Sequence, residues 1–564
     1  MRLLSGDEAL AQGAWEDGLR VACSYPGTPA TEILEYLARF SDVDCQWSVN
    51  EKVAYEVAVG ASIAGARSLY ASKHVGVNVA MDPLMTSAYT GVGGGFIVVT
   101  ADDPGLHSSQ NEQDNRLVAH MAKMPLLEPS SPREAKEFVS TAFSLSEDFD
   151  TPVIIRLTTR VAHTKENVSV GDRRDVLPKI FSINPGKYVM VPGHAYKRHI
   201  ELEQRLVRLK EYAEHSPLNR IEKGSSRRGI IAASVAYLYA KEMYPDVSFL
   251  KLGMSYPFPD ELIRKFAASV DEVVVIEELE PFLEEHIRML GIPVKGKHPS
   301  FRVGELRPEL IPAVVNGEAK EETPSTTRKP VMCPGCSHRP VFWTLKKLKA
   351  VVTGDIGCYT LGALPPLGSL HSCLCMGASI TFFEGFQKVL DRNVVAVIGD
   401  STFVHSGITG LINAAYNKAK GLIIILDNGT TAMTGSQPHP GTGKTIKGEE
   451  TKRLRLEEIC RAAGADSVDI INPFNTADLE ALVKRRIEEK ALSVIIARFP
   501  CRILNRNAAT ARQCDKNMCS KCLLCLSIDC PALSKTEDGF VSIDPRFCVG
   551  CGLCAKVCPK KAIK

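Results

Sequence analysis

The chain has 564 residues, and its 45% hydrophobic and 24% charged residues give it the composition of an ordinary globular protein. Its formal net charge of +3 gives no electrostatic case for binding nucleic acid or an anionic membrane. The length exceeds what one hydrophobic core supports, so we expect three or four domains. No apolar run approaches the roughly 18 residues of a membrane span, and the N-terminus turns acidic at once, unlike a secretory signal. We therefore expect a cytoplasmic protein that does not cross a membrane.

Residues 1–175 alternate between strand-like and helix-like segments. Short apolar runs at Val21–Tyr25, Phe96–Thr100 and Pro152–Leu157 predict buried strands. The pattern at Glu51–Ala66 predicts a helix between the first two of them. This alternation favours doubly wound α/β layers over sandwiches or helical bundles, and we expect residues 1–175 to form the first domain.

Residues 176–228 have a different character, because Tyr196 to Arg228 is dense in Arg, Lys, Glu and His. We interpret this segment as a solvated helix and connector. Residues 229–315 return to an α/β pattern and predict a small domain. Its expected elements are a helix at Ile231–Met243, a strand at Val247–Leu250, a helix at Asp260–Ala268 and a strand at Val273–Glu277.

A polar, turn-rich segment, residues 316–330, predicts a linker before the next domain, residues 331–505. In that domain two apolar runs read as buried strands on either side of a helical pattern. The expected elements are strands at Val394–Ile398 and Leu422–Leu426 and a helix at Ile408–Ala419. The three together predict one β-α-β unit.

Asp400 and Asn428 directly follow the two strands of this unit. Right-handed parallel pairing places the carboxyl ends of both strands at one edge of the sheet, where ligands bind. Carboxylate and amide oxygens are ligands that suit Mg²⁺, which also binds phosphates of a substrate or cofactor. The alternative is that both residues only cap the following helix and turn.

Eight cysteines in the tail, residues 514–564, form two runs of similar spacing. Each run has three cysteines separated by two residues and a fourth cysteine followed by proline. Three thiolates of one loop reach three corners of an iron–sulfur cube, and the cysteine before proline ligates the other cluster. The expected ligands are Cys519, Cys522, Cys525 and Cys558 for cluster one, and Cys548, Cys551, Cys554 and Cys530 for cluster two.

Structural zinc is the alternative interpretation of these cysteines, because C-x-x-C pairs also suit tetrahedral zinc. Two triplets, each accompanied by Cys-Pro, fit zinc poorly and fit two-cluster ferredoxins well. The tail therefore resembles a bacterial-type ferredoxin module. We expect it to hold two 4Fe-4S clusters and to transfer single electrons.

The segments GDSTFVHSG and DNGTTAMTGSQ, residues 399–407 and 427–437, resemble the signature with which thiamine diphosphate enzymes hold Mg²⁺ and the diphosphate of the cofactor. The resemblance implies that the metal is bound by Asp400, by Asn428 and by the backbone carbonyl of Thr430. Gly399, which opens the first segment, belongs to the same implied cofactor site.

A second part of the implied cofactor site resembles the pyrimidine domain of the 2-oxoacid:ferredoxin oxidoreductases. Asn50-Glu51 precedes a helical pattern whose glycines match those of that family. The resemblance implies that Glu51 activates the aminopyrimidine ring; the alternative is a helix-start residue favoured by the helix dipole. YPGTP, residues 25–29, resembles the family's loop in which Thr28 approaches the carboxylate of the substrate.

Two cysteine-containing segments extend the resemblance. CPGCSH, residues 333–338, is similar to the opening of the family's diphosphate domain, and GDIGC, residues 354–358, follows as it does there. The implied cofactor contacts are Cys336, His338, Gly357 and Cys358. Without the family, the pairs Cys333/Cys336 and Cys373/Cys375 would be two halves of a zinc site, although their spacings do not fit two C-x-x-C motifs.

The order of the domains resembles the large alpha subunits of the family branch that oxidises aryl pyruvates such as indolepyruvate. Four segments carry this resemblance: LLSGDEALAQGA, LHSSQNEQDNR, VIIRLTTRVAH and DNGTTAMTGSQPHPGTG. It implies oxidative decarboxylation of an aryl pyruvate with coenzyme A, giving an arylacetyl-CoA, CO₂ and reduced ferredoxin. The implied partners are ferredoxin, as electron acceptor, and a smaller beta subunit in an alpha-beta or alpha2beta2 assembly.

Two other functions stay open at this point. A sibling enzyme would act on pyruvate, 2-oxoglutarate or branched-chain 2-oxoacids, because no residue of the sequence fixes the side chain of the substrate. A non-catalytic electron-transfer subunit would keep the fold without the cofactor, and the presence of Glu51, Asp400 and Asn428 argues against it. The expected fold class is multidomain α/β, with thiamine diphosphate-binding doubly wound folds and a two-cluster ferredoxin-like C-terminal domain.

Overall fold

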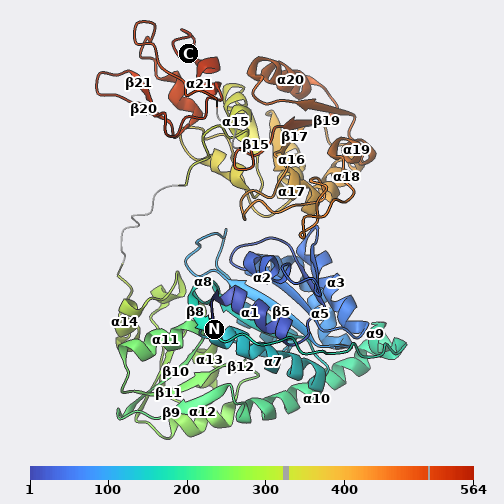
Figure 1. Ribbon diagram of the computed structural model, residues 1–564, viewed down its shortest axis with the longest axis vertical. Coiled ribbons are helices and arrows are strands. Elements are labelled where there is room, and N and C mark those ends of the chain that lie inside the picture. Colours follow the sequence, from blue (N-terminus) through green and yellow to red (C-terminus); the bar gives the residue numbers. More distant parts are fainter. Residues whose placement is uncertain (322–329, 506–508) are drawn as a thin grey trace. The chain divides into compact units, whose positions relative to one another are not determined.

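The computed structural model of the chain describes residues 1–321, 330–505 and 509–564. It divides into two compact units, Met1–Pro324 and Ser325–Lys564 (Figure 1). Helix α14 (Ile311–Asn316) ends where the predicted linker begins, and most of that linker, residues 316–330, lies outside the described residues. In the described part of the chain, no helix has both the length and the apolarity needed to span a membrane.

The first unit contains a seven-stranded sheet in the order β12-β6-β7-β5-β4-β2-β3. All neighbouring strands pair in parallel except β12, which runs antiparallel at the edge. The three strands predicted within residues 1–175 are confirmed as β2, β5 and β7. The strands are β2 (Val21–Ser24), β3 (Asp44–Trp47), β4 (Ser68–Lys73), β5 (Phe96–Asp102), β6 (Leu126–Leu127), β7 (Val153–Thr158) and β12 (Met254–Tyr256).

Side chains alternate between the two faces of the sheet along each strand, and helices cover both faces. On one face, the ring of Tyr55 in the predicted helix α3 packs 5.1 Å from the ring of Tyr70 and 5.2 Å from that of Phe96. On the other face, Gly95 lies against Phe143 of helix α7. The helices around this sheet are α1 (Gly6–Glu16), α2 (Thr31–Leu37), α3 (Glu51–Ile63), α4 (His74–Val79), α5 (Met81–Thr90), α6 (Asn115–Ala122), α7 (Pro132–Phe149) and α8 (Thr159–His163).

A five-stranded sheet in the order β14-β13-β10-β11-β9 completes the first unit. Its elements are β9 (Asn219–Glu222), β10 (Arg228–Ala233), α11 (Ser234–Met243), β11 (Ser248–Leu252), α12 (Asp260–Ala267), β13 (Glu272–Ile276), α13 (Phe282–Met289) and β14 (Val294–Lys295). The predicted start of a helix at Ile231 is wrong, because Arg228–Ala233 is the central strand and pairs in parallel on both sides. Such a short apolar run has no decisive periodicity, so burial between two strands determines its structure.

The segment predicted as a solvated helix and connector has a further structural role. Helix α10 (Pro192–His215) exposes most of its charged side chains, but Arg198 and Arg205 are buried. Arg198 Nε donates to Tyr89 O at 2.7 Å, and Arg205 Nη1 donates to Ala88 O at 2.8 Å. Two guanidinium groups therefore satisfy carbonyls of the last turn of α5, the end of the helix that favours cations.

The second unit is built on a parallel five-stranded sheet in the order β15-β16-β17-β19-β18. The predicted β-α-β unit is confirmed as β16, α18 and β17. Because Gly399 lies opposite Leu426, the ends of β16 and β17 meet at one edge of the sheet. The elements are α15 (His338–Lys347), β15 (Val351–Thr353), α16 (Ala378–Gln387), β16 (Val394–Gly399), α17 (Asp400–Thr402), α18 (Ile408–Tyr416), β17 (Gly421–Asp427), α19 (Leu456–Ala462), β18 (Ser467–Ile471), α20 (Thr476–Glu488) and β19 (Leu492–Arg498).

The C-terminal tail packs on this sheet domain within the same unit. Its regular elements are the hairpin of β20 (Leu533–Lys535) and β21 (Val541–Ile543), and helix α21 (Leu553–Val557). Arg339 of α15 is 1% exposed and donates to Ile528 O at 2.8 Å and to Asp529 O. Phe474 of the sheet domain shares a hydrophobic cluster with Ile528 and Val557. The tail is therefore anchored through buried contacts.

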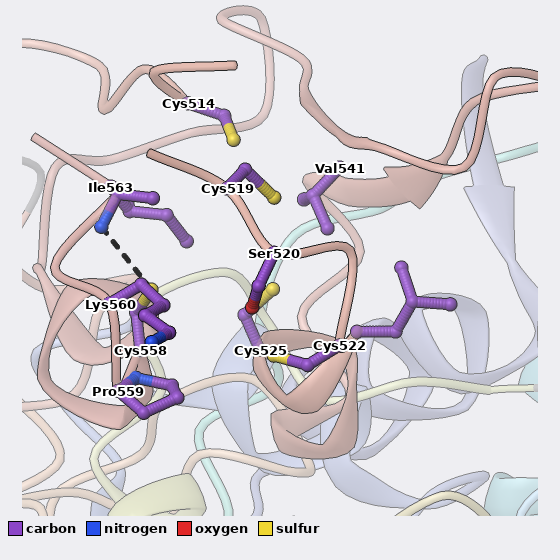
Figure 2. A pocket seen from close by; sticks show the side chains of 12 residues that line it. Cys514, Cys519, Ser520, Cys522, Cys525, Val541, Cys558, Pro559, Lys560 and Ile563 are labelled. Atoms are coloured by element: carbon purple, nitrogen blue, oxygen red, sulfur yellow. Dashed lines mark hydrogen bonds between the residues drawn. The ribbon is translucent and has the colours of Figure 1, made fainter. Parts of the chain in front are cut away.

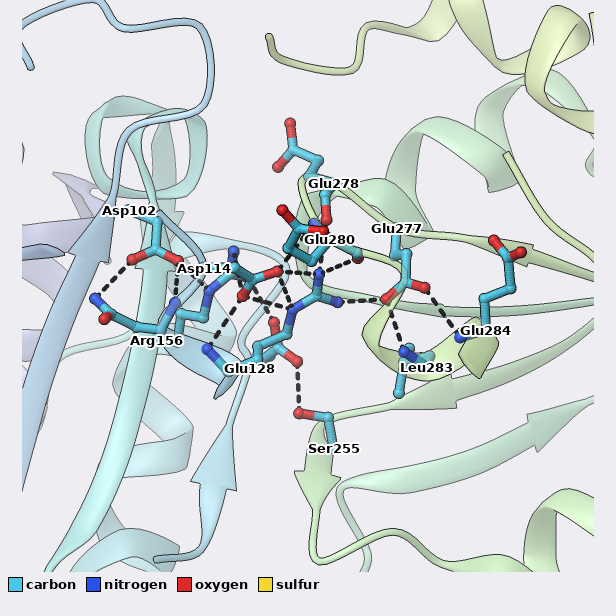
Figure 3. Close-up of polar contacts among 12 residues, drawn as sticks. Asp102, Asp114, Glu128, Arg156, Ser255, Glu277, Glu278, Glu280, Leu283 and Glu284 are labelled. Atoms are coloured by element: carbon cyan, nitrogen blue, oxygen red, sulfur yellow. Dashed lines mark hydrogen bonds and ion pairs between the residues drawn. The ribbon is translucent and has the colours of Figure 1, made fainter. Parts of the chain in front are cut away.

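A buried ion network joins the seven-stranded and five-stranded sheets of the first unit (Figure 3). Arg116, at the start of α6, lies 2.5 Å from a carboxylate oxygen of Asp114 and 2.6 Å from one of Glu277. Asp114 caps α6 beside the seven-stranded sheet, whereas Glu277 directly follows β13 of the five-stranded sheet. Burial opposes the ionisation of Asp114, but Arg116 and Arg156 outweigh it, so the pKa of Asp114 lies below its ordinary value.

We expect Arg116→Met to lower the free energy of unfolding of the first unit by about 3–5 kcal/mol, because two carboxylates stay buried without their shared cation. Urea denaturation of the full chain, followed by circular dichroism, measures this loss. Since the pKa of Asp114 is lowered, the stability that it confers is present above about pH 4 and is lost as the pH falls. The control is Arg227→Met, whose side chain is 90% exposed and should contribute less than about 1 kcal/mol. Equal losses in the two variants would contradict the importance of the network.

Candidate functional site

Asp400 is buried at the carboxyl end of β16, in the first turn after the strand. Its Oδ1 accepts a hydrogen bond from Ser401 N at 2.9 Å, and its Oδ2 accepts one from Gly429 N at 2.8 Å. Nε2 of His439 lies 3.3 Å from the same Oδ2. Burial opposes ionisation, but His439 and the two backbone donors outweigh it, so the pKa of Asp400 lies below its ordinary value. This carboxylate is ionised at neutral pH and held in one orientation.

His439 is a site residue that the sequence analysis did not single out. Its Nδ1 accepts a hydrogen bond from Gly441 N at 3.2 Å. The proton of the neutral ring therefore resides on Nε2, the atom that faces Asp400. The available signal was a histidine between two prolines inside the segment DNGTTAMTGSQPHPGTG, which carries the family resemblance.

Asn428 and Thr430 lie just beyond the end of the neighbouring strand β17. Asn428 Oδ1 accepts a hydrogen bond from Thr430 N at 3.0 Å, and Asn428 Nδ2 lies 3.5 Å from Nε2 of His338. Gly429 between them has a φ of +74°, a conformation that favours glycine. Burial lowers the pKa of His338 to about 4, so its ring is neutral at pH 7. The structure thus brings Asp400, Asn428 and His338 to one sheet edge.

The donors at this edge fit a magnesium ion that also binds a diphosphate. Mg²⁺ prefers hard oxygen ligands, and it usually takes one or two carboxylates together with phosphate oxygens and water. Asp400 offers an ionised carboxylate, while Asn428 and Thr430 offer an amide oxygen and a backbone carbonyl. Oδ1 of Asp400 accepts the N–H of Ser401 and keeps a second lone pair for a metal, whereas Oδ2 faces both Gly429 N and His439.

Two predicted glycines make room for the ring of Tyr359. A Cβ at Gly399 would lie 2.7 Å from that ring, and a Cβ at Gly357 would lie 2.4 Å from it. The hydroxyl of Tyr359 donates to Ile356 O at 2.9 Å, so the ring has a fixed position. Gly357 and Cys358 therefore lie beside the turn that carries Asp400.

Glu51 begins helix α3 in the first unit and is 6% exposed. The helix is capped by Asn50, whose side chain accepts from a backbone N–H of the first turn at 2.9 Å. Glu51 packs against Gly76 of α4, where a Cβ would lie 2.8 Å from its Cγ. Glu56, in contrast, is exposed and forms an ion pair with Lys52. Of these two glutamates, only Glu51 is placed as a buried functional carboxylate would be.

Thr28 lies in the loop between β2 and α2, close to a lysine that the sequence analysis did not single out. Ser108 Oγ donates to Thr28 O at 3.1 Å, and Lys73 Nζ donates to Ser108 O at 2.8 Å. Burial lowers the pKa of Lys73 to about 8, although Asp103 and Glu51 oppose this effect. A cation near Thr28 suits a substrate carboxylate. One lysine at the end of a strand carries no sequence signal, so only the fold reveals it.

The first predicted set of cluster ligands lines one pocket in the tail. Figure 2 shows the side chains of Cys519, Cys522 and Cys525 on one side and that of Cys558 across from them. Cys514 lines the same pocket, although the spacing gave it no role. The structure thus groups three cysteines of one run with the last cysteine of the other, as the crossed ligation requires.

The second predicted set, Cys530, Cys548, Cys551 and Cys554, lines a separate pocket. Pro334 and Gly335 of the CPGC segment line it as well. Gly335 has a φ of +72°, and a Cβ there would lie 2.5 Å from Val549 of the tail. Glycine therefore allows the sheet domain to touch the wall of this pocket directly.

The spacing of the thiols argues against single zinc ions. Four thiolates around one zinc lie within about 4 Å of one another, because each Zn–S bond is about 2.3 Å long. Among the described residues, the only three Cys, His, Asp or Glu side chains with ligand atoms within 4.8 Å of one another are Asp7, Glu32 and His163. The tail cysteines surround wider spaces, which suit a cube of iron and sulfide.

Four further cysteines gather between this sheet edge and the tail. Burial raises the pKa of the Cys358 thiol to about 11, and the nearby thiols of Cys333 and Cys501 contribute to the rise. Burial likewise raises the pKa of Cys336 to about 12, with contributions from Cys358 and Cys333. Cys501 N donates to Asn428 O at 2.9 Å, which links this set to the candidate magnesium site.

This grouping differs from the zinc alternative considered for the sequence. There, the partners of Cys333/Cys336 were Cys373/Cys375, but in the structure they are Cys358 and Cys501. Cys501 lies beyond β19 and far from the other three in sequence. No local spacing could indicate it, because the sheet topology alone brings it to the site.

Three protein families match parts of the chain. Residues 12–215 match the family described as pyruvate flavodoxin/ferredoxin oxidoreductase, thiamine diP-bdg. Residues 355–497 match the thiamine pyrophosphate enzyme, C-terminal TPP binding domain, and residues 541–564 match the 4Fe-4S binding domain. These ranges contain Glu51, Asp400 and four of the tail cysteines, respectively.

Relatives of known name cover the whole chain. Indolepyruvate oxidoreductase subunit IorA of Archaeoglobus fulgidus is 40% identical over 100% of this chain and 97% of its own length. The protein of the same name from Pyrococcus horikoshii is 38% identical over 99% of this chain and 96% of its own length. The 2-oxoglutarate synthase subunit KorA of Archaeoglobus fulgidus is 26% identical over 56% of this chain and 99% of its own length.

We expect Cys558→Ala to remove the cluster that Cys519, Cys522 and Cys525 help to hold, because Cys558 faces their pocket. Iron analysis should find about four fewer irons per chain, and electron paramagnetic resonance of the reduced protein should retain one cluster signal. The control is Cys514→Ala, which changes the same pocket and should leave both clusters intact. Loss of the cluster held by Cys548, Cys551 and Cys554 would contradict the crossed ligation.

Proposed function

This chain belongs to the family of indolepyruvate oxidoreductase IorA subunits, and from that premise we propose that it catalyses the ferredoxin-dependent oxidative decarboxylation of aryl pyruvates with coenzyme A. The products are an arylacetyl-CoA, CO₂ and reduced ferredoxin. Membership of the family makes the chain a subunit of an iron–sulfur-linked 2-oxoacid oxidoreductase. The substrate class and the use of coenzyme A are the parts that we add.

One observation carries the proposal. The ionised Asp400 and the amide of Asn428 stand at one sheet edge, and Cys501 donates to Asn428 O from the four-cysteine set beside that edge. This backbone hydrogen bond supports a route for electrons from the candidate magnesium site toward the tail. A scaffold subunit that had lost its cofactor would not need a buried, ionised carboxylate there.

Thiamine diphosphate, when bound, supplies the electron sink that allows the carboxylate of a 2-oxoacid to leave as CO₂. We assign its magnesium ion to Asp400, Asn428 and the carbonyl of Thr430. The other contacts assigned to the cofactor are Cys336, His338, Gly357, Cys358 and Gly399. His439 lies 3.3 Å from Oδ2 of Asp400, and we assign it as a positioning residue.

Glu51 serves the ring end of the cofactor. A buried carboxylate accepts a hydrogen bond from a nitrogen of the aminopyrimidine ring and favours the proton at that atom. Gly76 leaves room for the side chain of Glu51, and Asn50 caps the helix that Glu51 begins. We therefore assign proton placement at the ring to Glu51.

The carboxylate of the 2-oxoacid is assigned to Thr28 and Lys73. Lys73 is mostly protonated at pH 7, since its pKa lies near 8, and it stands beside the loop that contains Thr28. An ammonium group pairs with a carboxylate more strongly than a neutral donor does. The two residues orient the carboxylate of the 2-oxoacid. Other residues contact the aryl group.

Electrons are proposed to leave through the cysteine sets in the order of their contacts. Cys333, Cys336, Cys358 and Cys501 adjoin the magnesium site and lie between it and the tail. Pro334 and Gly335, inside that CPGC segment, line the pocket of cluster two. Cluster one follows it in the tail and is the donor to ferredoxin in this proposal.

A partner subunit completes the proposed enzyme. The relatives are named as subunits, and we propose a smaller beta subunit in an alpha-beta or alpha2beta2 assembly. Activity of the isolated chain is therefore expected to be low.

Glu51→Gln should slow substrate-dependent reduction of the clusters by roughly 10²–10⁴-fold, because it keeps the size of the side chain and removes the charge that favours the ring proton. Binding of thiamine diphosphate, measured by calorimetry, should change little. Glu56→Gln is the matched control, since Glu56 lies in the same helix with an exposed side chain. If the two variants reduce the clusters at the same rate, Glu51 does not have this role.

The function is tested by an anaerobic assay of ferredoxin or viologen reduction, with the partner subunit and coenzyme A supplied. We expect indolepyruvate and phenylpyruvate to give the highest kcat/KM, with pyruvate, 2-oxoglutarate and branched-chain 2-oxoacids well below them. Asp400→Ala should abolish activity and leave the iron content unchanged, since the clusters lie in other pockets. A preference for 2-oxoglutarate would assign the chain to a sibling activity. Turnover by Asp400→Ala would contradict the magnesium site.

A further inference from the structure

Asp7, Glu32 and His163 come together in the first unit, outside every site described above. One ligand atom from each lies within 4.8 Å of those of the other two. They come from three different helices: Asp7 from the first turn of α1, Glu32 from the first turn of α2, and His163 from the end of α8. Local sequence spacing does not explain this meeting, so it is a product of the fold.

Close backbone packing fixes the positions of two of these helices. A Cβ at Gly6 would lie 2.0 Å from the carbonyl oxygen of Val161, so only glycine allows the start of α1 to touch α8. The N-terminus of α1 is held by a capping box in which Ser5 and Glu8 bond each other's backbone N–H groups. Asp7, between these residues, is therefore held firmly and directed away from the cap.

Asp7 lacks the partners that a buried carboxyl group normally has. It is 0% exposed, and among the residues that the structure describes, no N–H or hydroxyl group donates to either of its carboxylate oxygens. Oε2 of Glu32 is also buried without a partner. Buried polar groups are almost always satisfied, so three unsatisfied oxygens at one point call for a missing group.

The electrostatics of the cluster favour a cation. Asp7 and Glu32 bring two carboxyl groups to one point, and the carboxyl group of Asp7 is fully buried. A cation would compensate these charges, and His163 is exposed, which leaves an open side through which an ion and its water ligands can enter.

We propose that Asp7, Glu32 and His163 bind a divalent transition-metal cation, with water in the remaining coordination positions. Two carboxylates and one imidazole form a mixed oxygen and nitrogen donor set, which suits Zn²⁺ and its neighbours better than Mg²⁺ or Ca²⁺. Bonds of about 2.0–2.2 Å place donor atoms around one ion about 3–4 Å apart, which small adjustments of these side chains reach. This inference does not depend on the proposed reaction.

Such an ion would restrain the loop between β2 and α2, which contains Thr28. Helix α2 begins three residues after Thr28, so an ion bound to Glu32 links this loop to α1 and α8. The cation is therefore a positioning element for the loop and takes no part in the reaction itself.

The test measures Zn²⁺ binding to the full chain with its iron–sulfur clusters loaded and Mg²⁺ in excess, which keeps other sites occupied. Equilibrium dialysis with metal analysis should find one Zn²⁺ per chain in the wild type. Asp7→Asn and His163→Gln should each weaken the binding at least about tenfold. Glu8→Gln is the matched control: it lies next to Asp7, its carboxylate bonds the cap, and it should bind Zn²⁺ as the wild type does.

The outcomes separate the proposal from its alternative, in which Asp7 and Glu32 merely share a proton. If the wild type binds no Zn²⁺ beyond the level of both variants, the cluster is an acid pair and the proposal fails. His163→Gln decides the question even if Asp7→Asn does not fold, because His163 is exposed and its change leaves the core intact. Equal binding by the wild type and His163→Gln would also overturn the site.

Discussion

The parallel pairing of the strands in the second unit is the constraint on which the candidate site depends. Four strands of one sheet end at the same edge, and each end delivers a part of the site. β15 leads to the segment with Gly357 and Cys358, β16 to Asp400, β17 to Asn428 and β19 to Cys501. An antiparallel sheet would send half of these groups to the opposite edge.

The sequence predicted the parts of this arrangement that local pattern specifies. Asp400 and Asn428 follow apolar runs that predicted buried strands on either side of a helix, so their convergence followed from the handedness of β-α-β units. The cysteine sets of the tail were predictable for a similar reason, because two-residue spacers fix which thiols share a loop. In both cases a short segment of sequence determines which side chains come together.

The remaining features depend on contacts between distant segments. Lys73 and Cys501 have ordinary sequence surroundings, and each joins a site only because another element packs beside it. Strand β10 was misread for the same reason, since its neighbours on both sides determine its structure. The density of charged residues also misled the interpretation of helix α10. Its sequence resembles that of a solvated surface helix, yet Arg198 and Arg205 are buried against carbonyls of α5. Periodicity reports an average environment and cannot identify single buried charges.

The path of the chain through the first unit also affects how this unit can be divided. Strand β12 belongs by sequence to the half that forms the five-stranded sheet, yet it pairs with β6 and completes the seven-stranded one. Its Ser255 donates to Glu128, so the crossing strand is also part of the polar contacts between the halves (Figure 3). Neither half can be expressed alone without an exposed sheet edge and buried charges that have lost their partners. Residues 1–315 therefore behave as one cooperative unit in folding, and a gene for this protein could be split after it but not within it.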